Sequence, residues 1–416
     1  MAQDDVVIIG GGIIGVSTAY FLARSGVPVT LIEKGEIGAG SSSGNAGFIC
    51  PGHSTPIPAP GVLTQGLKWL LDAASPFYIK PRLDKDLVSW LWRFQSFCNQ
   101  KSFDTAVPLL RDWQRASLAL FPQLIEQEKL DCHFAQKGSM ILYKTEKGFA
   151  EGQHEAAILQ RFGLAMSVLN GDEARELETA VHPDVIGGIY SPEDAHIAPD
   201  LFVRGLAQAA QAYGATILTQ TEVMGFEVEN GRITTLNTTN GSREIKEVVL
   251  AAGAWSTAVT RDLNLHIPMQ PAKGYSITGR QPAPSPQMPL YLGEARVAVT
   301  PMGPNLRLAG TLELAGFDFS INRRRVQAIQ DAANAYLVSA NMPEPVEIWS
   351  GMRPCTPDGL PYVGRSRQYD NLIAATGHAM LGLSMGPITG QVAAELVLGK
   401  RPSLDPAPFH VERFSA

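Results

Sequence analysis

The 416-residue chain is short of charge, of cysteine and of long apolar runs without glycine. Charged residues make up 18% of it and the net charge is −6, so no basic surplus indicates a nucleic-acid partner. Its four cysteines, Cys50, Cys98, Cys132 and Cys355, lack the spacing of a metal site or a disulfide framework. We therefore expect no metal, no disulfide scaffold and a reducing compartment.

The N-terminal residues MAQDD are polar and acidic, and they lack the basic segment of a secretory signal. This predicts a cytoplasmic protein.

Hydrophobic residues make up 45% of the chain, which suits a well-filled core. The length predicts two or three domains.

The most conspicuous apolar stretch, residues 6–23, is about as long as a membrane span, but four glycines interrupt it. Its β-branched first part ends in glycine, which is typical of a buried parallel strand. Residues 13–26 then have the composition of a helix that ends at Gly26, and residues 27–35 predict a second strand. The pattern is a βαβ unit with G-x-G-x-x-G at Gly10, Gly12 and Gly15.

Each position of this motif has a physical reason. Gly10 permits a tight turn, Gly12 lets the backbone approach a pyrophosphate, and Gly15 lets the helix pack closely on the strand. The helix N-terminus offers free N–H groups to the phosphates, and Glu33 can accept hydrogen bonds from ribose hydroxyls. We predict dinucleotide binding; the alternative is a purely structural glycine turn.

Three later stretches favour FAD over NAD. Residues 38–56 form a small, polar, glycine-rich and serine-rich segment that could wrap a second phosphate or a flavin edge. Residues 246–257 predict another buried strand that ends in Ala-Gly-Ala. Residues 371–399 predict a strand, a glycine-rich turn and a helix that begins near Pro387, whose N-terminus could face the flavin.

Eight stretches carry a family resemblance: VVIIGGGIIGVSTAYFLARSG (6–26), NAGFICPGHSTPIPAPGV (45–62), LKWLL (67–71), PAKGYSITG (271–279), RVAVTP (296–301), LRLAGTLELAGFD (306–318), WSGMRPCTPDGLPYVGRS (349–366) and GHAMLGLSMGPITGQ (377–391). They resemble the FAD-dependent oxidoreductases of the D-amino-acid oxidase, sarcosine oxidase and glycine oxidase group. Within that group the chain is most similar to bacterial D-amino-acid dehydrogenases of the small-subunit type, including the hydroxyproline dehydrogenase-like chains.

The resemblance implies an α/β fold in which a Rossmann-like FAD-binding domain is interleaved with an α+β substrate domain. We expect the FAD-binding domain at 1–85, 191–265 and 350–416. The substrate domain, with an antiparallel sheet over the flavin, is expected at 86–190 and 266–349.

FAD is expected to be bound noncovalently. The covalent cysteine of sarcosine oxidase aligns near Gly351, and Cys355 is expected to be a small buried side chain. The motifs place the following residues at the cofactor: Gly10, Gly12, Ile13, Ile14, Gly15, Glu33, Lys34, Ser42, Ser43, Asn45, Ala46, Gly47, Val223, Ala252, Gly253, Trp255, Gly377, His378, Gly382, Leu383 and Ser384.

The chemistry of flavin-dependent amine oxidation calls for a carboxylate clamp rather than a catalytic triad. Arg353 is the first candidate because a guanidinium fork holds a carboxylate at two points. The alternative is a structural Arg353 that pairs with Asp358. Tyr275 could donate to the carboxylate or wall the pocket, and could equally be ordinary strand packing.

Two further residues are candidates for the active site. His53 could lie near the flavin ring or the substrate, or be a satisfied loop histidine. Arg307 stands where sarcosine oxidase-like relatives have a lysine that assists oxygen reduction, so an arginine there favours another electron acceptor. The alternative for Arg307 is a solvated residue at a strand end.

The sequence favours a D-amino-acid dehydrogenase that passes electrons to a quinone or another carrier. Cyclic imino acids such as D-proline or D-hydroxyproline are a close variant of the substrate. The alternatives are an oxygen-using oxidase for glycine, sarcosine or a D-amino acid, and a flavin subunit of a larger complex. Trp69, Trp90 and Trp92 could mark a peripheral membrane contact at the inner face or a partner interface, although buried helix packing is the more common explanation.

Overall fold

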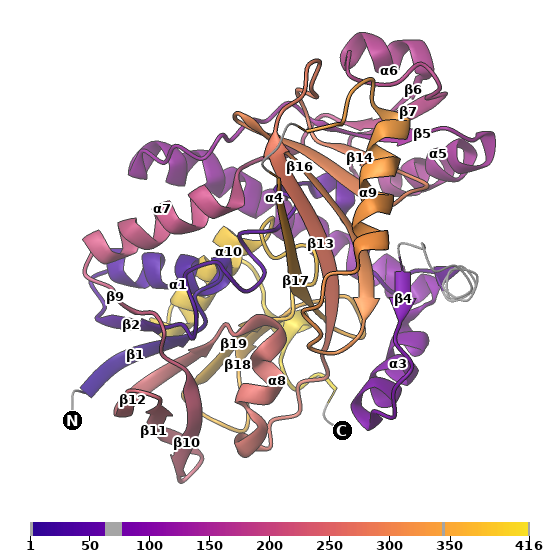
Figure 1. Cartoon of the computed structure of the whole chain (residues 1–416). Coiled ribbons are helices and arrows are strands. Elements are labelled where there is room, and N and C mark those ends of the chain that lie inside the picture. The colour runs from indigo at the N-terminus through magenta and orange to yellow at the C-terminus, as the bar shows by residue number, and fades with distance from the viewer. Residues whose placement is uncertain (1–2, 63–76, 343–345, 415–416) are drawn as a thin grey trace.

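A computed structural model describes residues 3–62, 77–342 and 346–414. Two large sheets dominate it, one in the lower left of Figure 1 and one through the centre and right. The chain passes between the two sheets several times, so each sheet contains strands that are far apart in the sequence. The predicted α/β class with an additional antiparallel sheet is confirmed.

The first sheet has eight strands and is built around the predicted βαβ unit. Its central strands are parallel because β1 pairs with both β2 and β12, and β12 pairs with β19. The order along the sheet is β10 (Val223–Glu229), β11 (Arg232–Thr238), β12 (Gly241–Leu250), β1 (Gln3–Ile9), β2 (Val29–Ile32) and β9 (Thr216–Leu218), with β19 (Leu372–Thr376) on β12 and β18 (Tyr362–Arg365) on β19.

Both faces of this sheet are covered, which explains why β1 is apolar without alternation. Val6 and Ile8 pack on the helical face, whereas Val7 and Ile9 pack on the opposite face. The helical layer consists of α1 (Ile13–Arg24), α7 (Pro199–Ala212) and α10 (Gly386–Val397), and α1 packs between the other two.

The second sheet has nine strands and is largely antiparallel. Its order is β17 (Glu347–Cys355), β13 (Gln270–Arg280), β16 (Asn305–Leu314), β15 (Val297–Met302), β14 (Leu290–Leu292), β5 (Ser139–Tyr143), β7 (Gly187–Ser191) and β6 (Ser167–Asn170), with β4 (Phe77–Ile79) on β16. Helix α9 (Arg323–Tyr336) covers one face through Val326, Ile329 and Ala333.

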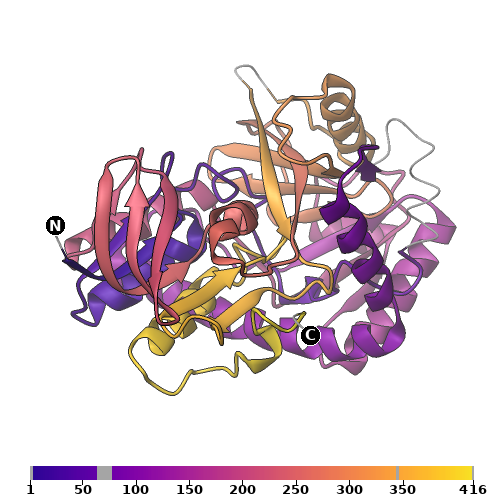
Figure 2. The same ribbon diagram turned by 90° about the horizontal axis from the view of Figure 1, so that it is seen from below.

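Three long helices and one short helix lie on the outside of the two sheets. These are α3 (Lys85–Phe97), α4 (Gln100–Glu128), α5 (Glu146–Arg161) and α6 (Gly171–Leu177). Helix α4 packs Phe121 and Leu124 into the core under α1, so it joins the two halves of the molecule. Figure 2 shows α3 and α4 on the side away from the N-terminus. No helix in the described ranges has both the length and the apolarity that a membrane crossing requires.

Two strands cross the domain boundaries expected from the sequence. Strand β4 lies in the range 1–85 and the second half of β17 lies in the range 350–416, yet both pair within the nine-stranded sheet. We propose that the FAD-binding unit ends before β4 and resumes after Cys355. The sequence alone did not predict these boundaries, because the sequence of a strand does not indicate which of two sheets the strand joins.

Gly15 tests how strictly the βαβ turn depends on close packing. A Cβ at Gly15 would lie 1.9 Å from the carbonyl oxygen of Gly10, a distance that no rearrangement of side chains can relieve. We expect Gly15→Ala to lower the free energy of unfolding by about 3 kcal/mol or more. Gly26→Ala is the matched control, because its Cβ meets open space and only the φ of +78° opposes it, at about 1 kcal/mol. Urea unfolding measures both, and equal losses would contradict the packing argument.

Candidate active site and cofactor cavity

The glycine motif forms one wall of a cavity of about 610 Å³ at the carboxyl ends of the parallel strands. Gly10 has φ +111°, and a Cβ there would lie 2.4 Å from the carbonyl oxygen of Ala251. A Cβ at Gly12 would meet only Ser42 Oγ, at 3.3 Å. Protein packing therefore explains Gly10, whereas the cavity itself explains Gly12, as expected where a backbone approaches a pyrophosphate.

The N-terminal ends of two helices carry neither an N-cap side chain nor a carboxylate. Neither α1 nor α10 has a side-chain cap hydrogen bond or an acidic residue in its first turn. Their positive dipole ends are therefore not neutralised by the protein. Gly12, Ile13 and Ile14 of the α1 end line the cavity, and the Ile13 N–H donates to Ser42 Oγ at 3.0 Å. This end suits a diphosphate.

Glu33 closes the cavity at the end of β2. Its two carboxylate oxygens accept backbone hydrogen bonds from Gly11 (2.6 Å) and Gly35 (2.8 Å), which fix the side chain. Each oxygen keeps a lone pair for a ribose hydroxyl. Beside it, Lys34 Nζ lies 4.2 Å from the ring centre of Trp255, and both side chains line the cavity.

Most of the predicted cofactor residues line this cavity. They are Gly10, Gly12, Ile13, Ile14, Glu33, Lys34, Ser42, Asn45, Val223, Ala252, Gly253, Trp255, Gly377, His378, Gly382 and Leu383. Ala46 and Ser384 line the neighbouring cavity instead. Three other described residues, Gly15, Ser43 and Gly47, line neither of these two cavities.

Gly47 and Ser43 act through the loop backbone rather than by facing the cavity. Gly47 has φ +81°, and a Cβ there would lie 2.5 Å from the carbonyl oxygen of Ile197. The Ser43 carbonyl accepts a hydrogen bond from Arg307 Nη1 at 2.7 Å, and the Asn45 carbonyl accepts one from the same nitrogen at 2.8 Å.

Arg307 therefore lies elsewhere than the sequence suggested. It is 5% exposed, lines neither cavity, and also donates through Nε to Thr278 Oγ1. It is neither solvated nor in contact with a cavity. We propose that it positions the glycine-rich loop on the antiparallel sheet.

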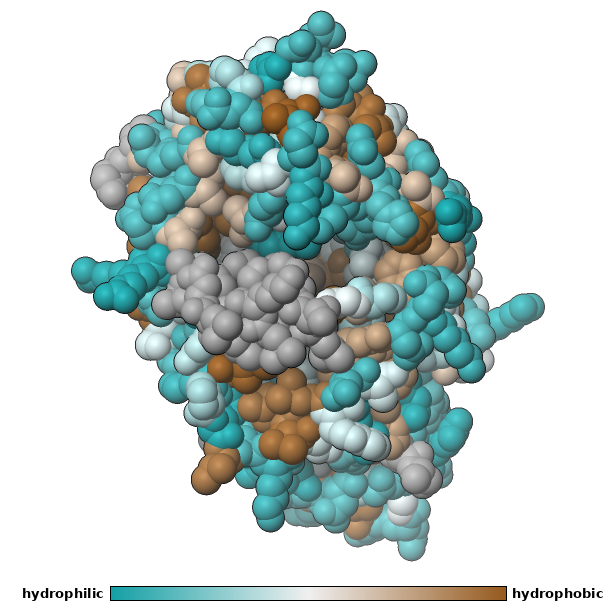
Figure 3. Space-filling model, turned by 90° about the vertical axis from the view of Figure 1, so that its right-hand side faces the viewer, coloured by the Kyte–Doolittle hydropathy of each residue, from teal (hydrophilic) through white to brown (hydrophobic). Residues whose placement is uncertain are grey.

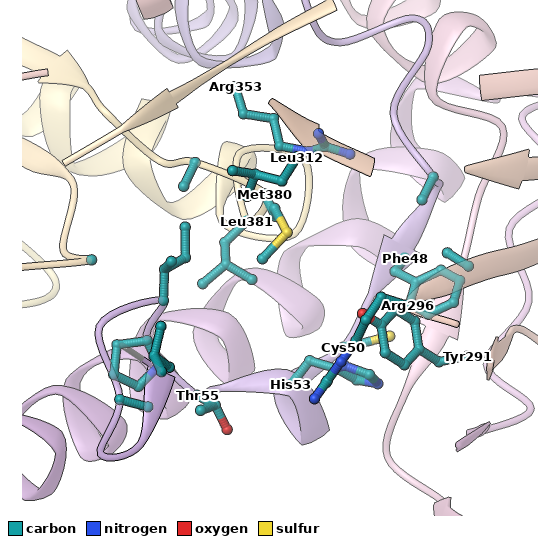
Figure 4. A pocket seen from close by; sticks show the side chains of 18 of the residues that line it. Phe48, Cys50, His53, Thr55, Tyr291, Arg296, Leu312, Arg353, Met380 and Leu381 are labelled. Carbon is teal, nitrogen blue, oxygen red and sulfur yellow. The ribbon is translucent and has the colours of Figure 1, made fainter. Parts of the chain in front are cut away.

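A second cavity, of about 890 Å³, adjoins the first, and Ser41, Asn45 and Ala379 line both. Arg353 enters it from β17, as Figure 4 shows. Its Nη1 donates to the Thr311 carbonyl at 2.8 Å, and burial lowers the pKa of the guanidinium from its ordinary value. A Cβ at Gly274 would lie 2.0 Å from Nη1, so glycine at that position makes room for the arginine.

The structural alternative for Arg353 does not hold. Asp358 instead accepts two hydrogen bonds from Arg413, at 2.7 and 2.8 Å. Arg353 is thus a cation without that carboxylate, directed at a cavity. Both expectations for Tyr275 apply: it lines the second cavity, and its ring also packs in the core under α9. Its hydroxyl accepts a hydrogen bond from the Asn322 N–H at 3.4 Å.

His53 lines the second cavity and lies against Phe48 and Tyr291. Its ring centroid is 5.8 Å from that of Phe48 and 5.6 Å from that of Tyr291. Its Nε2 is buried without a hydrogen-bond partner among the described residues. Burial, and then the charge of Arg296, lower the pKa of His53 to about 4, so the ring is neutral at pH 7. It is not the satisfied loop histidine of the alternative reading.

His53 also stands near Cys50 and Asp194, and ligand atoms of the three lie within 4.8 Å of one another. Both oxygens of Asp194 already accept hydrogen bonds, from Gly52 N (2.9 Å) and Ser139 Oγ (2.6 Å). Burial raises the pKa of the Asp194 carboxyl to about 6. The expectation that the protein holds no metal stays a prediction.

Sequence reasoning missed two residues of this cavity, Tyr291 on β14 and Arg296 in the turn that leads to β15. The sequence places Arg296 at a turn just before a strand, but nothing there indicates in which direction its side chain points. Cys355 is 2% exposed, and burial raises the pKa of its thiol to about 12. A thiol of this kind is unsuited to a covalent flavin link.

The glycine motif, the two helix N-termini and Glu33 fit a dinucleotide, and the second cavity adjoins its site, as in an oxidoreductase that binds FAD. The chain belongs to the DAO family, described as FAD dependent oxidoreductase, whose sequence model matches residues 5–396. FAD is therefore its cofactor, and the prediction of an FAD-dependent enzyme is confirmed.

Individual relatives span the whole chain. It is 30% identical to a D-amino acid dehydrogenase of Vibrio atlanticus, over 99% of this chain and 100% of the relative. It is 32% identical to a D-amino acid dehydrogenase of Methylobacterium radiotolerans, again over 99% and 100%. The structure of glycine oxidase from Geobacillus kaustophilus superposes with a TM-score of 0.77 at 26% identity, over 99% of each chain.

The buried histidine of the last glycine-rich turn predicts acid sensitivity. His378 is 4% exposed, its Nε2 pairs with Thr389 Oγ1 at 3.0 Å, and burial lowers its pKa to about 3. In the unfolded chain this histidine binds a proton near pH 6.5, whereas in the folded chain it stays neutral down to about pH 3. Its contribution to the free energy of unfolding is therefore fully present above pH 6.5 and is lost as the pH falls. From pH 7 to pH 5 this histidine costs about 2 kcal/mol.

We expect His378→Gln to lessen the pH dependence of unfolding by that amount. Urea unfolding at saturating FAD, at pH 7 and pH 5, measures it. A variant whose stability falls as steeply as that of the wild type would contradict the assignment of a neutral buried imidazole.

Proposed function

We propose that the protein is a D-amino-acid dehydrogenase that oxidises the Cα–N bond of a D-amino acid or cyclic imino acid. The observation that carries this proposal is the desolvated Arg353 guanidinium, which faces the chamber next to the cofactor cavity. FAD, when bound, accepts two electrons from the substrate carbon. The D-amino acid dehydrogenases at 30–32% identity over the full length support the substrate class.

The residues of the chain do the work of binding and orientation. Arg353 grips the substrate carboxylate, and its bond to the Thr311 carbonyl fixes the guanidinium plane. Leu312, Met380 and Leu381 lie near it in Figure 4 and form an apolar part of the cavity wall. A carboxylate held this way presents the carbon next to it toward the shared wall of the two cavities, at Ser41, Asn45 and Ala379.

We also infer that the electrons leave to a carrier other than oxygen. Arg307 stands where sarcosine oxidase-like relatives have a lysine that assists oxygen reduction, and this arginine donates to loop carbonyls and lines neither cavity. The names of the dehydrogenase relatives support a carrier, whereas the glycine oxidase structures favour oxygen as the second candidate.

A quinone in a membrane suits the surface near α3. Leu83, Val88 and Trp92 are strongly exposed apolar residues, and Trp92 is 73% exposed. Val88 and Trp92 lie one helical turn apart on the same side of α3. Figure 3 faces this side of the molecule and shows hydrophobic side chains gathered on it. Trp90, by contrast, is buried and donates to the Cys355 carbonyl, and Trp69 lies outside the described residues.

The carboxylate clamp is tested by Arg353→Leu. We expect kcat/KM for D-amino acids to fall about 100-fold, because a charge-assisted pair is lost. Turnover of the corresponding amino-acid amides, which carry no carboxylate, should change far less. Arg353→Lys keeps the positive charge but loses the planar guanidinium fork. Its kcat/KM should therefore lie between those of the wild type and Arg353→Leu. Stopped-flow reduction of the bound FAD measures all three, and an unchanged KM in Arg353→Leu would refute the clamp.

The acceptor is tested by following electrons from one D-amino acid to dissolved oxygen, to a soluble dye and to ubiquinone in phospholipid vesicles. We expect little hydrogen peroxide and efficient reduction of the vesicle quinone. Trp92→Ser should slow the vesicle reaction several-fold and leave the dye reaction unchanged, with Leu201→Ser on the exposed side of α7 as the control. Stoichiometric peroxide without an added acceptor would make the enzyme an oxidase.

A further inference from the structure

The substrate chamber extends well beyond the Arg353 guanidinium. Its volume of about 890 Å³ reaches from Arg353 to a group of polar side chains on the far side, His53, Tyr291 and Arg296, which lie beside Phe48 (Figure 4). Arg353 needs only a small part of this space for one carboxylate. The polar side chains on the far side are therefore free to contact another part of the ligand.

These polar side chains converge on one another from separate segments. The rings of His53 and Tyr291 have centroids 5.6 Å apart. The Arg296 charge acts on both, since it lowers the pKa of His53 and opposes the rise that burial imposes on the pKa of Tyr291. The charge of Arg353 also lowers the pKa of Tyr291 against the rise that burial imposes.

Their hydrogen-bonding capacity is not used up within the described part of the chain. His53 Nε2 is buried and has no partner there. Arg296 makes no ion pair with a described carboxylate, although its surface lines the cavity. Glu155, the acid whose charge reaches it, is exposed and accepts a hydrogen bond from Thr55. A buried imidazole nitrogen is costly without a partner. Arg296 is exposed and shares a side-chain hydrogen bond with Tyr291, so it keeps further N–H donors free for a ligand.

The backbone at Arg296 is held in a conformation that an L-residue rarely adopts. Its φ is +56°, and its N–H donates to the Leu292 carbonyl at 2.7 Å in the turn between β14 and β15. This conformation costs about 1–2 kcal/mol. Strain of this kind collects where a side chain must point in a particular direction, and here the direction is into the chamber.

We propose that Arg296, Tyr291 and His53 form a second subsite of the substrate chamber that binds an oxygen atom of the substrate side chain. The subsite selects amino acids that carry a side-chain hydroxyl or carboxylate. A guanidinium and a phenol donate to such an oxygen, and the neutral imidazole can exchange a hydrogen bond with it. The inference rests on the proposed function for the placement of the α-carboxylate at Arg353.

Two pairs of substrates of nearly equal size separate the oxygen from the carbon skeleton. D-glutamate is compared with D-norvaline, and 4-hydroxy-D-proline with D-proline; the first pair reports a carboxylate and the second a hydroxyl. We expect kcat/KM of the wild type to favour the oxygen-bearing member of at least one pair. Arg296→Gln should reduce that preference about 10-fold or more and leave the apolar member within about 2-fold. Tyr291→Phe should act in the same direction.

Two control variants keep the result specific. Arg353→Leu should weaken both members of a pair equally, because both carry the α-carboxylate. Arg280→Gln makes the same change of charge on the exposed end of β13 and should change neither. A loss that is equal for both members in Arg296→Gln would instead make Arg296 an anchor of the α-carboxylate, and would overturn the subsite.

A binding measurement is independent of the oxidation. Calorimetry of the FAD-loaded protein with glutarate and pentanoate, which have no amine, compares two acids of the same carbon number. If glutarate binds more tightly and Arg296→Gln removes the difference, the carboxylate-binding form of the subsite holds even where no amino acid reduces the FAD. In that case only the proposed function fails. An absence of preference in both the kinetic and the binding pairs refutes the subsite.

Discussion

The structure depends above all on the approach of one helix to one strand without an intervening Cβ. At Gly15 the backbone of α1 lies so close to the Gly10 carbonyl that a methyl group would stand 1.9 Å from it. This contact sets the position of the α1 N-terminus at the end of the parallel strands, and with it the uncapped N–H groups that face the nucleotide cavity. The phosphate site is thus a consequence of packing, because the same glycines that close the turn also direct the helix dipole.

The glycine-rich loop fixes the position of the second cavity relative to the first. Ser42 Oγ accepts from the α1 N-terminus, while the carbonyls of Ser43 and Asn45 accept from Arg307 on β16. One short segment is therefore tied to both sheets. Because Asn45 lines both cavities, the wall between cofactor and substrate is held from either side. A desolvated arginine is well suited to this task, since its planar fork can satisfy two carbonyls and a hydroxyl at once.

Local sequence patterns were sufficient for the nucleotide half and insufficient for the chamber. The βαβ unit was predictable because its signals, apolar strand, glycine turn and terminal Glu33, all lie within residues 4–33. Arg353 could be found because it sits in a distinctive motif. Arg307 could not be placed, and the lining and packing roles of Tyr275 could not be told apart, because which face of a strand meets the cavity depends on pairing between distant strands. Arg296 was missed for a related reason: its direction follows from a left-handed backbone conformation that no neighbouring glycine announces.

Charge balance decides what the chamber can bind. Arg353 and Arg296 place two cations in a largely apolar space, and His53 stays neutral at pH 7 because burial and Arg296 both oppose its protonation. Glu155 offsets part of this charge from an exposed position, where water screens it. The chamber therefore favours an anionic ligand whose amine is neutral, which is the form of an amino acid that can give up electrons. In the subsite that we propose, a ligand with only one oxygen-bearing group leaves one guanidinium to water or to the Thr311 carbonyl, and a ligand with two such groups gains a further charge-assisted hydrogen bond.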